Sequence, residues 1–179
     1  MIKSNNIPSS VIFPYADDLH QKQQQLWDNL QQGLLFEGQR VFLPWETSYK
    51  GLSKLAVKKI KQSDRTIWWL GERVILGGLQ SRLHILQWFD VSGSAKINKV
   101  TGNLGQDYEG YHRFQEAEQH LVKMFGKPHS KEMEPAGPME LGAVEWTHNN
   151  ICIRLSGIEI FTFRYSLNIY QANASTKSF

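Results

Sequence analysis

Two stretches of the chain align without a gap and decide the fold: Ile67-Trp68-Trp69-Leu70-Gly71-Glu72-Arg73-Val74-Ile75-Leu76 and Val144-Glu145-Trp146-Thr147-His148-Asn149-Asn150-Ile151-Cys152-Ile153. The alignment places Trp69 over Trp146. Each stretch continues into a second apolar strand and follows a helical segment. Self-similarity at a fixed spacing is typical of a duplicated structural unit. The sequence therefore predicts an α+β protein of two tandem helix-plus-antiparallel-sheet repeats, with the two tryptophans at equivalent positions.

Clusters of glycine, proline and polar residues, which favour turns and loops, divide the chain further. We expect an N-terminal arm (1–15), a first helix/sheet unit (16–101), a linker (102–110), a second helix/sheet unit (111–170) and a flexible tail (171–179). An extra helix at about 17–32, capped by Asp17 or Asp18 and stopped by Gly33, opens the first unit.

Turn residues and apolar spacing predict the remaining elements of the first unit. A short strand falls within 36–43, and Thr47 or Ser48 caps a helix that extends to Ile60 and is ended by Ser63-Asp64. Strands follow at about 66–70, 73–79, 82–90 and 95–101, with turns at Gly71-Glu72 and Gln80-Ser81.

The second unit is predicted to open with a helix at about 111–125 that buries Phe114, Ala117, Leu121, Met124 and Phe125. The loop at 129–142 is long for a compact domain and is either mobile or functional. Strands at about 143–148, 150–155 and 158–169 complete the unit, with Asn149-Asn150 at the first turn.

Composition narrows the protein class. A chain of 179 residues with 41% apolar and 21% charged residues fits a soluble globular protein. No apolar run approaches the roughly 20 residues that span a bilayer. The start lacks the apolar core of a signal peptide, and the single Cys152 fits a reducing compartment, so we expect a cytoplasmic protein without membrane association. A net charge of +3 does not by itself indicate nucleic acid.

No pattern of reactive side chains predicts an enzyme or a cofactor. His112, Glu116 and His120 repeat every four residues on one helix face and could share a metal, but the spacing is not His-Glu-x-x-His, so a solvated polar face is favoured. Cys152 lies between two isoleucines and is expected to be a buried, inert thiol. A small hydrolase or metal enzyme built on the two histidines and the glutamate remains one alternative.

Basic residues gather in one segment, comprising Lys50, Lys54, Lys58, Lys59, Lys61 and Arg65. On the predicted helix they form a stripe, for which a solvated face is favoured and an acidic protein partner comes next. A nucleic-acid-associated module using this lysine-rich helix is the other alternative, although no known recognition motif accompanies it.

Aromatic residues exceed what a one-sided core requires. His84, Leu86 and Trp88 alternate along one predicted strand, and Phe161, Phe163 and Tyr165 alternate along another. Both faces of these strands are partly apolar. The surplus either packs the two units together or forms an exposed partner-binding patch.

The layout from about residue 45 to 170 resembles the tandem helix-plus-sheet units of the beta-lactamase inhibitor protein family, and also bacterial immunity proteins that neutralise a toxin. The motifs are Pro44-Trp45-Glu46-Thr47-Ser48, Gly77-Gly78-Leu79, and Phe125-Gly126-Lys127-Pro128 with Trp146 beyond. The chain departs from that inhibitor by having one cysteine, no signal and the extra helix at 17–32. The resemblance implies a mode of action, in which a sheet face blocks another protein.

These observations favour a bacterial, cytoplasmic immunity protein that neutralises a cognate toxin by steric occlusion. Its partner is expected to be a protein, with a cognate toxin domain as one candidate, and no metal, cofactor or membrane is involved. The candidate anchors are Trp88 and Tyr165, and the candidate charged neighbours are Arg82, Arg164 and Glu46.

Overall fold

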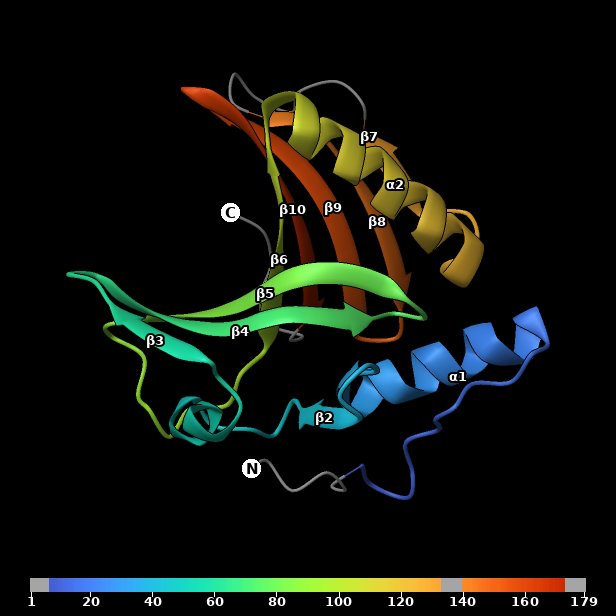
Figure 1. Ribbon diagram of the computed structural model, residues 1–179, viewed down its shortest axis with the longest axis horizontal. Helices are drawn as coiled ribbons and strands as arrows, with labels where there is room; N and C mark the ends of the chain where they lie inside the picture. Colours follow the sequence, from blue (N-terminus) through green and yellow to red (C-terminus); the bar gives the residue numbers. More distant parts are fainter. Residues whose placement is uncertain (1–6, 133–139, 173–179) are drawn as a thin grey trace. The chain divides into compact units, whose positions relative to one another are not determined.

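The computed structural model describes residues 7–132 and 140–172 and confirms the α+β class (Figure 1). A two-stranded sheet pairs β1 with β2, and eight strands are hydrogen-bonded in the order β3-β4-β5-β6-β10-β9-β8-β7. The chain forms two compact units, Met1–Val100 and Thr101–Phe179. The predicted arm, loop and tail fall partly outside the described residues, at 1–6, 133–139 and 173–179 respectively.

The first unit contains two helices and five complete strands within the described part of the chain. In order they are α1 (Leu19–Gln32), β1 (Gly33–Phe36), β2 (Val41–Pro44), the 3-10 helix η1 (Tyr49–Lys54), β3 (Lys58–Lys61), β4 (Arg65–Ile75) and β5 (Leu79–Trp88). The single strand predicted within 36–43 is therefore wrong, because β1 and β2 form an antiparallel hairpin there.

Helix α1 begins and ends as the sequence predicts. The Asp18 side chain accepts a hydrogen bond from the Gln21 amide at 2.9 Å, which satisfies one of the free donors of the first turn. Gly33 ends the helix and starts β1. Leu26, Trp27 and Leu30 are buried on one side of α1.

Polar side chains of α1 also hold the segment that precedes it. Asn29 is 2% exposed, and its side chain accepts from the Ile12 amide and donates to the Ile12 carbonyl, both at 2.9 Å. Gln25 accepts from the Ala16 amide at 2.8 Å. Val11 packs with Leu35, Phe42 and the rings of Phe13 and Tyr15. The described part of the predicted arm is therefore attached to the first unit.

A buried carboxylate joins three segments of this unit. Glu37 Oε1 accepts from the Tyr15 hydroxyl at 3.1 Å and from the Gly77 amide at 2.6 Å. Burial, followed by the charge of Glu37, raises the pKa of the Tyr15 hydroxyl above its usual range. Tyr15 therefore stays a hydrogen-bond donor at neutral pH and links the arm to the turns after β1 and β4.

The predicted helix that runs to Ile60 is wrong beyond its first turns. Ser48 caps η1 by accepting from the Gly51 amide at 3.2 Å, but the helix ends at Lys54. Residues 58–61 instead pair with 66–69 of β4 as an antiparallel strand. Strand pairing overrides the helical lysine spacing, so the predicted lysine-rich helix face does not exist.

The predicted turn at Gly71-Glu72 is also wrong. Strand β4 runs through this position with a bulge between Trp69 and Gly71, where Gly71 has φ of 81°. The chain reverses later, where Leu76, Gly77 and Gly78 all have positive φ. A bulge keeps a strand continuous while bending it, and glycine accommodates the left-handed backbone.

The tandem repeat is not confirmed. Asn149-Asn150 forms the turn between two strands, as predicted, but the aligned positions in the first stretch lie inside β4. Trp69 is partly exposed, whereas Trp146 is fully buried and its indole N–H donates to the Gly126 carbonyl at 2.9 Å. The ungapped alignment therefore does not mark equivalent structure.

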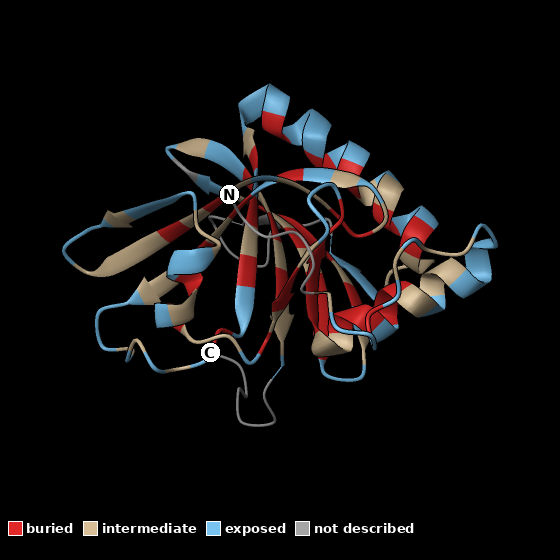
Figure 2. Ribbon diagram, turned by 60° about the horizontal axis from the view of Figure 1, so that its bottom comes forward, coloured by how far each residue is buried: buried red, intermediate tan, exposed pale blue. Residues whose placement is uncertain are grey.

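The second unit packs one long helix on an antiparallel sheet. Its elements are β6 (Lys99–Gln106), which begins in the first unit, α2 (Asp107–Phe125), β7 (Ser130–Glu132), β8 (Glu140–His148), β9 (Ile151–Ile160) and β10 (Thr162–Gln171). Helix α2 lies against β9 and β10 (Figure 1). The buried side of α2 includes the predicted Phe114, Ala117, Leu121 and Met124, whereas Phe125, also predicted to be buried, is only partly buried. The other sides of α2 are largely exposed (Figure 2).

Helix α2 begins before the predicted start, so β6 and α2 occupy the predicted linker at 102–110. Asp107 and Glu109 in its first turn favour this start, because carboxylates complement the positive end of the helix dipole. Gly110 allows the helix to approach β6 and β10. A Cβ at Gly110 would lie 2.6 Å from Gly105 C and 2.7 Å from a ring carbon of Tyr165.

Replacing Gly110 with alanine is expected to destabilise the protein by about 1–3 kcal/mol, because the added methyl group meets backbone that cannot rotate away. At an unobstructed helix position the same change stabilises by about 0.5–1 kcal/mol. The sign of the change in unfolding free energy therefore shows whether Gly110 is closely packed. Urea unfolding measures the difference, and Gln119→Ala on the exposed side of α2 is the matched control. A stabilised Gly110→Ala variant would contradict this close packing.

Asn29→Ala is expected to lower the free energy of unfolding by about 2 kcal/mol, since the Ile12 amide and carbonyl lose their partners. Gln24→Ala, on the exposed side of the same helix, is expected to change it by less than about 0.5 kcal/mol. Chemical denaturation of both variants tests this. Equal effects would show that the arm is not held through Asn29.

Candidate protein-binding face

The pairing of β4 with β5 gives the three-stranded part of the first unit two different faces. Trp68 lies opposite Ile85, and successive residues alternate between the faces. Trp68 is 4% exposed, and Leu70, Leu83 and Ile85 are buried with it on one face. The Trp68 indole N–H donates to Gln87 Oε1 at 3.1 Å, which satisfies its one donor.

The other face, called here the half-exposed face, carries mostly apolar and aromatic side chains that keep contact with solvent. Direct cross-strand pairing places Lys58 beside Trp69 and His84, and Ile60 beside Ile67 and Leu86. Trp88 is 46% exposed at the end of β5. The half-exposed face consists of Ile60, Ile67, Trp69, His84, Leu86 and Trp88.

Two contacts order the aromatic groups of this face. The Trp69 and His84 rings lie 5.3 Å apart between centroids, with an interplanar angle of 48°. The Arg65 guanidinium lies 4.6 Å from the centre of the Trp88 ring, which favours a cation–π contact. Arg65 is itself oriented by two hydrogen bonds to the Asp64 carboxylate, at 3.0 and 2.7 Å. Trp88 is therefore positioned rather than free to rotate.

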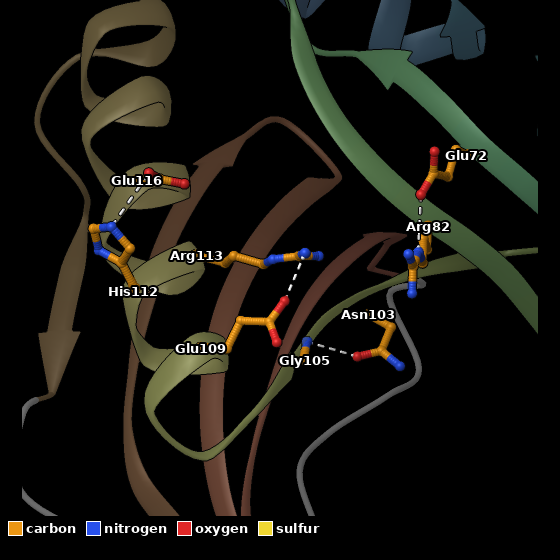
Figure 3. A network of polar contacts seen from close by, with 8 residues as sticks. All are labelled: Glu72, Arg82, Asn103, Gly105, Glu109, His112, Arg113 and Glu116. Carbon is orange, nitrogen blue, oxygen red and sulfur yellow. Dashed lines mark hydrogen bonds and ion pairs between the residues drawn. The ribbon is translucent and has the colours of Figure 1, made fainter.

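Charged groups border the half-exposed face. Arg82 donates to Glu72 at 2.9 Å across the far ends of β4 and β5 (Figure 3), and Arg65 is matched by Asp64. Strand β3 adds Lys58 on this face, whereas Lys59 and Lys61 alternate to the opposite face of the same strand. None of these three lysines forms an ion pair with a described residue. The border is therefore positive on the β3 side.

The structure places three of the predicted partner-binding residues in the first unit. Trp88 and Arg82 share one face of β5 but are six residues apart, about 20 Å along the strand. Glu46 follows β2, is exposed, and forms an ion pair with Lys96. These residues belong to one unit without converging on one point.

The other two predicted residues lie in β10, where alternation sends adjacent side chains to opposite faces. Tyr165 is 8% exposed and packs between Tyr111 and Phe114, with ring centroids 5.9 and 5.7 Å away. Burial raises the pKa of its hydroxyl. Its ring is covered by α2 and cannot serve as an exposed anchor, whereas Arg164 is exposed.

The predicted metal and thiol positions have ordinary surroundings. His112 Nε2 lies 3.7 Å from Glu116 Oε1, and both side chains are largely exposed on α2 (Figure 3). No group of three potential metal ligands occurs within 7–132 and 140–172. Burial raises the pKa of the Cys152 thiol, which disfavours the reactive thiolate. None of the described helices is long and apolar enough to cross a membrane.

Sequence reasoning missed the roles of Arg65, of the β3 lysines and of Trp69. The Lys-Lys-Ile-Lys segment is too short to show strand alternation, and only the register beside β4 places Lys58 and Ile60 on the half-exposed face. The alternation of His84, Leu86 and Trp88 was the available signal, and it groups the residues that share the half-exposed face of β5.

Comparison with protein-family models, curated proteins and solved structures finds no match to this chain.

We expect the free energy of unfolding to depend on pH through His84, which lies on the half-exposed face. Burial, followed by the charge of Lys99, lowers the pKa of His84, and its Nδ1 has no hydrogen-bond partner among the described residues. The unfolded imidazole titrates at about 6.5, so below that pH the unfolded chain binds more protons than the folded chain. Stability attributable to neutral His84 is therefore present above that pH and is lost as the pH falls toward the lowered folded pKa.

Urea unfolding at pH 7.5 and 5.0 tests this expectation. The wild type should lose more stability on acidification than His84→Gln. An identical pH dependence of wild type and His84→Gln would contradict a buried, neutral His84.

Proposed function

We propose that this protein binds another protein through the half-exposed face and inhibits it by occlusion, as immunity proteins do. The observation that carries the proposal is the row of apolar and aromatic side chains that β4 and β5 hold outside the buried face, with Trp88 nearly half exposed. An apolar centre with a charged border is the usual anatomy of a protein interface, and tryptophan is enriched among its energetic anchors.

The chemistry of the border favours an acidic partner surface. Lys58, which β3 places beside Trp69 on this face, carries positive charge without an ion-pair partner in the described chain, whereas Arg82 and Arg65 are already matched. Opposite charge at an interface border mainly increases the association rate. Trp88 and Trp69 would then supply most of the binding energy after docking.

Nucleic acid is the competing ligand, and the ring contacts weigh against it. Base stacking on tryptophan needs an accessible ring face. Trp68 is buried and has Lys59 Nζ 4.3 Å from its ring centre, while Arg65 covers one face of Trp88 and His84 contacts Trp69. The faces of the tryptophan rings are thus partly occupied by neighbouring side chains, which favours apolar contact with a protein over stacking of bases.

Inhibition by occlusion needs a preformed surface and no reactive group. The cross-strand pairs fix the half-exposed face without a ligand, and Arg65 orients its most exposed ring. A bacterial cytoplasmic immunity protein facing a cognate toxin domain is the role we propose, and it rests on this face. A hydrolase or metal enzyme gains no observation in its favour from His112, Glu116 and His120.

Trp88→Ala is expected to weaken binding of the native partner by about 2 kcal/mol, roughly 30-fold in Kd, because it removes the most exposed ring of the face. The partner is first recovered by affinity purification from the native cell, and binding is then measured by calorimetry. Phe89→Ala is the matched control, since Phe89 is the next residue and is 81% exposed beyond the end of β5. It should change Kd by less than twofold.

Charge variants separate the two ligand classes. Lys58→Gln is expected to slow association with a protein partner at low salt and to leave dissociation nearly unchanged. Recovery of nucleic acid alone, with a steep loss of affinity as salt rises, would refute protein binding. Tight protein binding that is indifferent to Trp88→Ala would refute this face as the site.

A further inference from the structure

A second exposed aromatic surface lies in the other unit, where the first turn of α2 meets the hairpin between β9 and β10. Phe161 is fully exposed and Tyr108 is 84% exposed, while Tyr111 and Phe163 are 43% and 39% exposed. We name these four residues the aromatic corner. Large rings at this exposure are uncommon unless they contact a partner.

Direct contacts join the two segments that carry the aromatic corner. The Phe163 amide donates to Asp107 Oδ1 at 3.3 Å, which joins the start of β10 to the start of α2. Tyr111 lies one helical turn after Asp107, and its ring contacts buried Tyr165 at 5.9 Å. Tyr165 is two residues from Phe163 on the same face of β10, about 7 Å away. Tyr111 and Phe163 therefore lie near buried Tyr165, while Tyr108 belongs to the first turn of α2 and Phe161 to the turn before β10.

The position of Phe161 adds an independent observation. Its φ is 67°. This is the left-handed region, which glycine and asparagine adopt readily and aromatic residues rarely do. A bulky ring held there, in full contact with solvent, contributes nothing to the core. Residues kept in unfavourable backbone conformations concentrate at functional sites.

Charge near the aromatic corner is negative. Glu159 lies directly opposite Phe163 and therefore on the same face of the sheet, and Asp107 belongs to the same junction. Glu109 is matched by Arg113 at 2.7 Å (Figure 3), and Arg164 projects from the opposite face. The first turn of α2 thus carries carboxylates, and Arg113 is engaged by Glu109.

We propose that the aromatic corner is a second binding site, and that it takes an arginine- or lysine-bearing segment of a partner protein. Aromatic rings attract cations through their negative faces, and the Asp107 and Glu159 carboxylates add direct ion pairing. The same charges disfavour nucleic acid and anionic membrane. This site uses residues of the second unit only and does not depend on the inhibitor role.

The test uses the full chain and a fluorescein-labelled peptide of alternating arginine and glycine, followed by fluorescence anisotropy at low and physiological salt. A glutamate–glycine peptide of the same length is the ligand control. The whole protein carries a net charge of +3 and therefore repels the cationic arginine peptide non-specifically. Binding of this peptide would therefore report a local site. Saturable binding of the arginine peptide alone is expected.

Variants then locate the site. Phe161→Asn, which keeps a residue suited to positive φ, should weaken binding about threefold, and adding Phe163→Ser should bring the loss to about tenfold. Glu159→Gln should weaken it about threefold. Arg164→Gln, on the opposite face of β10, and Phe89→Ser, in the first unit, should leave it unchanged.

Three outcomes overturn the proposal. They are absence of arginine-peptide binding, equal binding of the glutamate peptide, and binding that none of the corner variants weakens. A membrane role would also contradict the proposal. It would be shown if Phe161→Asn abolished association with phosphatidylserine vesicles and left peptide binding unchanged. Thermal unfolding of each variant confirms that the fold is retained, and Phe161→Asn alone suffices if the double variant is unstable.

Discussion

The register between β4 and β5 is the constraint on which the first unit depends. A one-residue slip would exchange the two faces of a strand, because successive side chains point in opposite directions. The observed register places Trp68 opposite Ile85 inside and Trp69 opposite His84 outside. The bulge before Gly71 changes the pairing once, and Glu72 then lies opposite Arg82. The same strand register therefore buries Trp68 and leaves Trp69 partly exposed.

In the second unit the corresponding constraint is the close approach of α2 to its sheet. Gly110 leaves room for the Tyr165 ring on the helix side, and Gly157, directly opposite Tyr165 on β9, adds no side chain beside it. Tyr165 thereby fills the end of the core, whereas Phe163, the next residue of the same face, and Phe161, in the turn before β10, are exposed. The exposed rings of the aromatic corner follow from where the helix begins.

Local signals in the sequence predict much of this fold. The cap at Asp18, the turn at Asn149-Asn150 and the buried side of α2 depend on neighbouring residues, and these predictions are correct. The predictions for residues 58–61 and for Gly71 are wrong, because pairing with a distant strand decides their conformation. For the site, alternation identifies the face of Trp88 and Arg82. It does not show that α2 covers Tyr165, since alternation defines two faces without saying which one a helix occupies.

Binding through the half-exposed face can be measured directly, because the chain has six tryptophans that differ in exposure. Trp27, Trp45, Trp68 and Trp146 are buried, whereas Trp69 and Trp88 retain exposure on this face. Fluorine NMR of protein containing 5-fluorotryptophan, with a soluble paramagnetic probe, reports which rings meet solvent. We expect the probe to broaden the Trp69 and Trp88 signals in the free protein and the native partner to protect both. Protection of neither signal in a saturated complex would contradict binding through this face.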